Sequence, residues 1–125
     1  MSAPITALNQ LNVAWADRFN ARDTDGILEL FTEDAVFVPQ PGVSVSGDGI
    51  RAATESFLAL GLPVNLAVRY VFEAGDVGLA IADWTLEGTG PNGGPVSLGG
   101  STSDVAVRGA DGAWRFVIDN PFGSA

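Results

Sequence analysis

The first half of the chain carries apolar residues at helical spacing. A helix is predicted over residues 4–21, since Pro4 suits a first helical position. Four large residues share one face of this helix: Leu8, Leu11, Trp15 and Phe19. A short second helix is predicted over residues 26–31 after an Asp23 cap, and a third over residues 48–60.

From residue 64 onward the period changes to that of strands. Four long runs are separated by turn signals: residues 64–74, 79–87, 96–108 and 113–119. Two short strands are predicted earlier, at residues 35–38 and 43–45, and residues 88–95 form a glycine- and proline-rich connection. This order predicts an α+β fold in a single domain over residues 1–125. Three N-terminal helices on one face of a curved, mostly antiparallel sheet would form a cone with a pocket inside.

Two carboxylates lie in apolar strands near the end of the chain, Asp104 and Asp119. A buried charge costs several kcal/mol unless it is paired, hydrogen-bonded or neutralised. The two acids therefore lie either on a wet face of the sheet or in a pocket. Alternatively, Asp119 organises the Asn120-Pro121 turn, and Asp104 is a solvated strand position opposite an interface formed by its apolar neighbours.

The turn between these strands decides whether the two acids meet. A two-residue Asp111-Gly112 turn places Asp104 directly opposite Asp119, where one of the two would hold a proton near neutral pH. A four-residue turn keeps both acids on one face, but diagonally. A three-residue turn places them on opposite faces and brings Asn120 beside Asp104. The sequence leaves these registers open.

The amino-acid composition limits the catalytic chemistry and the partners that the chain can have. The chain has no histidine and no cysteine, which excludes histidine-based dyads and triads, disulfides, and metal sites built on these ligands. Acid–base work near neutral pH falls to carboxylates, hydroxyls or water. The net charge of −9 disfavours nucleic acid and anionic membranes as partners. With no signal peptide and no long apolar run, a cytoplasmic protein without metal or cofactor is expected.

The order of elements, the segment NARDTDGILELFTEDAVFV from Asn20 and the ending DVAVRGADGAWRFVIDNPFG from Asp104 resemble the NTF2-like superfamily. Within it, they are most similar to the small SnoaL-like and ketosteroid-isomerase-like proteins. The resemblance implies an NTF2-like cone and homodimers formed through the open face of the sheet. It also implies isomerases, cyclases, dehydratases, epoxide hydrolases or binding proteins, so it does not by itself name an activity.

The resemblance carries over to the ketosteroid isomerase site only in part. The general base would fall on Pro39, which cannot take a proton. The hydroxyl donor on the first helix would fall on Trp15, which donates only through its indole N–H. The protonated aspartic acid that stabilises the oxyanion matches Asp104, and this enzyme is the standard example of such a neutral acid. The usual steroid isomerisation is therefore not expected.

Aromatic and polar residues on the predicted elements complete the candidate site. In residues 79–87, alternation places Trp84 with its apolar neighbours, facing the core or a ligand. The same two interpretations apply to Trp15, Phe19, Phe31 and Phe57. Three polar candidates for ligand binding are added, with turn, core and interface roles as alternatives: Gln40, Tyr70 and Asn120.

These observations predict a pocket for a small hydrophobic molecule of polycyclic or polyketide-like character. Isomerisation, cyclisation or dehydration would follow from proton transfer, with Asp104 as acid or hydrogen-bond donor and Asp119 as base. The alternative is a non-catalytic module for ligand binding or dimerisation, consistent with Pro39 where the base would lie.

Overall fold

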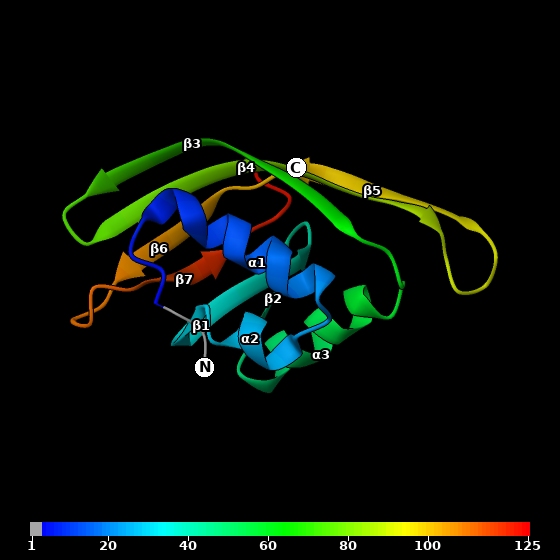
Figure 1. Ribbon diagram of the computed structural model, residues 1–125, viewed down its shortest axis with the longest axis horizontal. Helices are drawn as coiled ribbons and strands as arrows, with labels where there is room; N and C mark the ends of the chain where they lie inside the picture. Colours follow the sequence, from blue (N-terminus) through cyan, green and yellow to red (C-terminus); the bar gives the residue numbers. More distant parts are fainter. Residues whose placement is uncertain (1–3) are drawn as a thin grey trace.

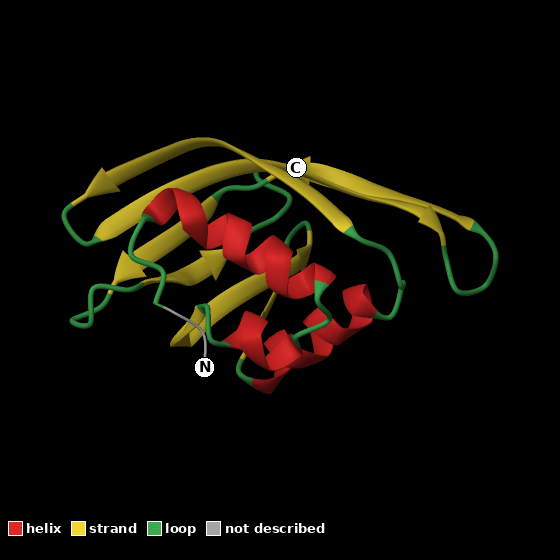
Figure 2. Cartoon of the chain, viewed as in Figure 1, coloured by secondary structure: helices red, strands yellow, loops and turns green. Residues whose placement is uncertain are grey.

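The computed structural model describes residues 4–125 as one curved sheet with three helices against its concave face (Figures 1 and 2). A 3₁₀ turn, Leu8–Gln10, leads into α1 (Leu11–Asn20), which is followed by α2 (Thr24–Leu28); α3 (Asp48–Leu58) comes after the first two strands. The strands are β1 (Phe31–Gln40), β2 (Val43–Ser46), β3 (Val64–Ala74), β4 (Val77–Thr89), β5 (Pro95–Ser101), β6 (Asp104–Arg108) and β7 (Trp114–Asp119). The predicted α+β class and the three N-terminal helices are confirmed.

The sheet has the strand order β2-β1-β7-β6-β4-β3, with β5 pairing the far half of β4. All neighbours are antiparallel except β1 and β7, which are parallel. The long β4 pairs with β6 along its first half and with β5 along its second, so the β4–β5 arm extends beyond the helices (Figure 1). The predicted run 96–108 is thus divided, although both parts keep one register on β4. At the break, Thr102 uses its side chain to accept a hydrogen bond from the Ala82 N–H.

Several predicted boundaries differ from the structure. The first helix begins at the 3₁₀ turn rather than at Pro4, and α2 ends before Phe31. Phe31 instead opens β1, which is much longer than the predicted strand 35–38 and runs through Pro39. Proline is tolerated there because β1 lies near the edge of the sheet, with an irregular register on β2 beyond Phe37.

The core lies between α1 and the concave face of the sheet. Along β4 every second residue faces inward, from Gly78 to Leu86. The largest fully buried side chains come from α1 and β7: Phe19, Trp114 and Phe116. Phe116 packs against Phe31 at 5.5 Å between ring centres. This core fixes which face of each late strand points toward the helices.

The β6–β7 hairpin combines a three-residue turn with a bulge. Gly109 N–H donates to the Ala113 carbonyl at 2.9 Å, and Gly112 takes a left-handed φ of 80°. Arg108 pairs with Trp114, as this turn requires. Between Val105 and Ala106, however, β7 contains one extra residue, Val117, so that Val105 pairs with Ile118.

This bulge determines the face of the sheet to which each of the two acids points. The three-residue turn alone would place Asp104 and Asp119 on opposite faces. Because the extra residue reverses the alternation, Asp119 points inward like Asp104, and both are buried. The turn therefore has the three residues of one predicted register. The two acids nevertheless share one face of the sheet, as predicted for the two-residue and four-residue turns.

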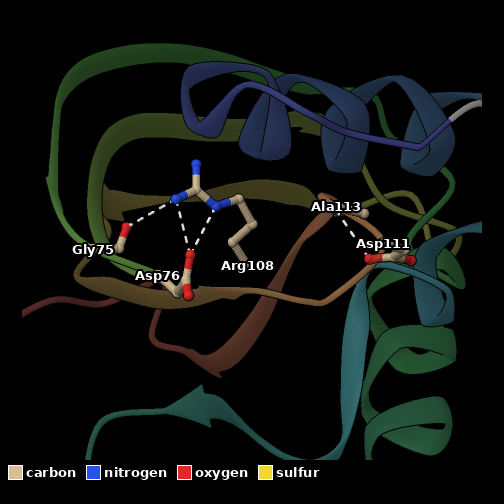
Figure 3. Close-up of polar contacts among 5 residues, drawn as sticks. All are labelled: Gly75, Asp76, Arg108, Asp111 and Ala113. Atoms are coloured by element: carbon tan, nitrogen blue, oxygen red, sulfur yellow. Dashed lines mark hydrogen bonds and ion pairs between the residues drawn. The ribbon is translucent and has the colours of Figure 1, made fainter.

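Surface ion pairs fasten the ends of these strands (Figure 3). Arg108 donates through Nε to Asp76 at 2.9 Å and through Nη2 to the Gly75 carbonyl, which ties β6 to the β3–β4 turn. Asp111 accepts from Ala113 N–H at 3.0 Å (Figure 3), and the pairing of its carboxylate with Arg115 lowers the pKa of Asp111 to about 2. These exposed contacts favour the turn geometry more than they add stability.

Replacing Gly112 with alanine should lower the free energy of unfolding by about 1 kcal/mol, since a side chain at left-handed φ is strained. A Cβ there would touch nothing within 4 Å, so backbone strain alone is measured. Gly94→Ala is the matched control, because this loop glycine has no left-handed φ. Urea unfolding of both variants checks the prediction, and equal losses would contradict it.

Candidate functional site

A pocket with a cavity volume of about 40 Å³ opens between α1, α3 and the concave face of the sheet. Its walls are almost entirely apolar. The aromatic members are Trp15, Phe19, Phe37, Phe57, Trp84 and Phe116. Apart from the indole N–H groups, three lining residues have polar side chains: Asn12, Thr102 and Asp119. Among the described residues of this lining, Asp119 is the only ionisable one.

Asp104 lies behind the pocket wall and is fully buried. Its Oδ2 accepts from Asn12 Nδ2 at 2.8 Å, and its Oδ1 accepts from the Asn120 N–H at 2.8 Å. One donor comes from α1 and the other from the end of β7. The Asp104 carboxylate thereby joins the helix layer to the sheet, and these hydrogen bonds compensate in part for the loss of water.

The two acids share a low-dielectric site. Burial raises the pKa of both carboxyl groups, and the charge of Asp104 and a hydrogen bond to it raise the pKa of Asp119 further. The hydrogen bonds donated to Asp104 oppose the effect of burial on its pKa. Within the pair, Asp104 is therefore the more acidic member, and Asp119 keeps its proton to the higher pH.

The C-terminal turn closes the pocket beside this pair. Asn120 donates through Nδ2 to the Gly123 carbonyl at 2.8 Å, and Ser103 N–H donates to the Asn120 carbonyl at 2.9 Å. Trp84 donates through Nε1 to the Pro121 carbonyl at 2.6 Å. These contacts hold the chain after β7 against β4 and β5. Asp119, the last residue of β7, lies beside them in the pocket lining.

Two buried polar atoms have no hydrogen-bond partner among residues 4–125, Trp15 Nε1 and Asn12 Oδ1. Both belong to residues that line the pocket. Such groups are rare in folded proteins, because an unmet donor or acceptor costs about 1–3 kcal/mol.

The structure brings five of the predicted residues into the pocket wall: Trp15, Phe19, Phe57, Trp84 and Asp119. The others lie elsewhere. Asp104 stands behind the wall, and Phe31 belongs to the core. The Asn120 side chain is engaged with Gly123 rather than pointing to a ligand.

Two further residues predicted to contact a ligand lie outside the pocket lining. Gln40 is exposed at the end of β1, where the irregular pairing with β2 carries the strand away from the cavity. Tyr70 is 53% exposed, because a shift in the register of β3 between Val68 and Tyr70 turns its side chain to the convex face.

Asn12 and Thr102 are functional candidates that the sequence reasoning missed. Asn12 lies four residues after Leu8 and three before Trp15, on the apolar face of the first helix. A single amide side chain among the apolar residues of a helix face indicates a buried polar contact, so Asn12 could have been identified from the sequence. Thr102 lies at the break between β5 and β6, which the alternation pattern does not reveal.

A family model described as the SnoaL-like domain matches residues 13–117. Among solved structures, a conserved protein from Planctomyces limnophilus is similar with a TM-score of 0.80 at 19% identity, covering 90% of each chain. An NTF2-like protein with a cystatin-like fold from Novosphingobium aromaticivorans has a TM-score of 0.72 at 18% identity, covering 90% of this chain and 76% of its own. A ketosteroid isomerase-like protein from Erwinia carotovora atroseptica has the same score and identity, covering 87% of each chain.

No curated protein matches the chain. The similarity to the solved structures confirms the NTF2-like fold and shows the fold alone, since their identities lie below 25%. Within residues 4–125, none of the helices has the length and apolar character needed to cross a membrane.

The acid pair predicts a characteristic dependence of stability on pH. The pKa of Asp119 is raised in the folded protein above the unfolded value of about 3.9, so the folded state binds the extra proton between these pKa values. The stability contributed by this group is complete below the unfolded pKa and is lost as pH rises through the folded pKa. Asp119→Asn should therefore gain stability relative to wild type over that window, by about 1.4 kcal/mol for every pH unit between the two pKa values.

Urea unfolding of wild type and Asp119→Asn at a series of pH values between 4 and 8, about the range in which a raised carboxyl titrates, measures this difference. Asp104→Asn is the matched control. It should lose about 1–3 kcal/mol at neutral pH, because an amide cannot accept both hydrogen bonds that the carboxylate accepts. If the difference in stability between wild type and Asp119→Asn does not change with pH, Asp119 is an ordinary ionised carboxylate and the prediction is wrong.

Proposed function

The chain belongs to the SnoaL-like domain family, and from this and the pocket we propose that it binds a small hydrophobic molecule and transfers a proton on it. The observation that carries the proposal is the position of Asp119. It is the one ionisable side chain of the lining, in an otherwise apolar cavity, and it lies against a second, fully buried acid. Isolated acids are not placed in this way for packing alone, because their burial is costly.

The pair can take up a proton and return it without a cofactor. When a C–H bond of the ligand gives its proton to an oxygen of Asp119, Asp119 passes its own proton to Asp104. The negative charge of the pair then resides on the ligand, and the reverse transfer returns the proton to the same or another carbon. Asp119 would touch the ligand, while Asp104 would hold the charge and position Asp119.

An acid pair that accepts and returns a proton in this way could catalyse isomerisation, cyclisation or dehydration. The apolar, aromatic wall suits a ring-containing or polyketide-like molecule more than a charged metabolite. A ketosteroid isomerase-like protein is among the structural relatives, and this supports the class of chemistry rather than its substrate.

A non-catalytic binding module is the second candidate. Proline stands at position 39, where the resemblance would place a general base, and Pro39 is not part of the pocket lining. Without proton transfer, the same cavity would still hold an apolar ligand, and the acid pair would serve to join α1 to the sheet.

Deuterium exchange separates these two functions. In D₂O, the protein should accelerate exchange of the C–H protons beside the carbonyl of α-tetralone, followed by proton NMR. Asp119→Asn should reduce the acceleration by at least about 100-fold, as for loss of a general base. Asp83→Asn, which changes an exposed acid on β4, is the control and should behave like wild type. Binding of α-tetralone without any acceleration would favour the binding module.

We also propose that the protein is a homodimer that buries the convex face of the sheet. Four strands carry apolar side chains there that lie next to one another in the strand register: Phe72 beside Leu79, Leu79 beside Val105, and Val105 beside Ile118. Phe72 is 57% exposed, an unusual value for a large side chain amid apolar neighbours. Contiguous apolar surface of this kind marks an interaction site.

Leu79→Glu should convert the dimer to a monomer, because the two introduced carboxylates would be buried against an apolar partner face. The measurement is sedimentation equilibrium or light scattering at several concentrations. Val43→Glu is the control, since this residue is similarly exposed but lies on β2, at the opposite edge of the sheet from β3. A wild-type protein that is monomeric at all concentrations would contradict the proposal.

A further inference from the structure

The unpartnered atoms of the pocket form a complementary pair. Trp15 Nε1 is a donor and Asn12 Oδ1 is an acceptor, and neither has a partner among the described residues. The two residues are three apart on α1, so their side chains are neighbours on one face of the helix. Asn12 is only 3% exposed, which keeps its amide away from bulk water.

The orientation of the Asn12 amide is fixed by its other contact. Its Nδ2 donates to the Asp104 carboxylate, which can only accept, so Oδ1 must be the end that remains free. The unpartnered atom of the Asn12 amide is therefore an acceptor and not a second donor.

The other polar groups of the lining are already satisfied. Trp84 Nε1 donates to the Pro121 carbonyl, and Thr102 accepts from Ala82 N–H while donating to the Ala80 carbonyl. Asp119 is engaged with Asp104. Outside the acid pair, the lining leaves one donor and one acceptor without a partner, on residues three apart along α1.

Few ligand groups satisfy both atoms. A carbonyl or ether oxygen accepts from Trp15 but leaves Asn12 Oδ1 unpaired. An ammonium group would serve Asn12 alone, and its charge is costly in an apolar cavity. A hydroxyl both accepts and donates through a single oxygen.

Building on the proposed function of the pocket, we propose that the ligand is an apolar ring-containing alcohol whose hydroxyl accepts from Trp15 Nε1 and donates to Asn12 Oδ1. The hydrocarbon part lies against the aromatic wall. The hydroxyl would be recognised at α1, close to the acid pair, since Asn12 itself donates to Asp104.

Three molecules of one shape test this assignment: β-tetralol, β-tetralone and tetralin, with cyclohexanol, cyclohexanone and methylcyclohexane as a smaller series. The alcohol should bind about tenfold more tightly than the hydrocarbon and several-fold more tightly than the ketone, because two hydrogen bonds form in the first case and one in the last. In the wild-type protein, the Trp15 indole N–H resonance should shift on addition of alcohol or ketone, and much less with the hydrocarbon.

Trp15→Phe keeps an aromatic ring but removes the donor, and should reduce the alcohol-to-hydrocarbon preference about fivefold. Trp84→Phe is the matched control, a tryptophan of the same pocket whose N–H is already used, and should leave that preference unchanged. Equal affinity for alcohol and hydrocarbon in wild type would overturn the inference while leaving the proposed function standing. Failure of both series to bind at all would overturn the proposed function and this inference with it.

Discussion

The buried carboxylate of Asp104 is the constraint on which the rest of the structure depends. It accepts from Asn12 of α1 and from the backbone after β7, so it joins the helix layer to the sheet at a point shielded from bulk solvent. A buried ion with two donors is tolerable, whereas a second ion beside it is not. The pKa of Asp119 is raised by burial and, beyond that, by the charge of Asp104 beside it.

The burial of Asp104 beside Asp119 also explains why the polar and apolar parts of the pocket wall are so unequal. Most of the wall is aromatic or aliphatic, and its only titratable group reaches the cavity from β7. The C-terminal turn, held by Asn120 and by Trp84, keeps this group in place. A site of this kind binds its ligand mainly through apolar contacts, and a few polar atoms distinguish one ligand from another. This division is usual in pockets for small molecules.

The sequence was sufficient for the class and the layout, because hydrophobic period and turn chemistry are local properties. It could not settle the meeting of Asp104 and Asp119, because a single bulge at Val117 reverses the alternation of β7 without any signal in composition. The same limit applies to Tyr70, which a shift in β3 turns outward. Asn12 was different, since an amide in the apolar stripe of a helix was visible and was passed over.

Asn12 belongs to both halves of the site, and this links recognition to chemistry. Its Nδ2 donates to the Asp104 carboxylate, while its Oδ1 is buried without a partner among the described residues. A hydroxyl that donates to Oδ1 polarises the amide and makes Nδ2 a better donor, because hydrogen bonds in a chain strengthen one another. Asp104 is then held more firmly as the ion, which keeps the shared proton on Asp119. Occupation of the alcohol position would thus favour the protonated form of Asp119, the neighbouring acid in the pocket lining.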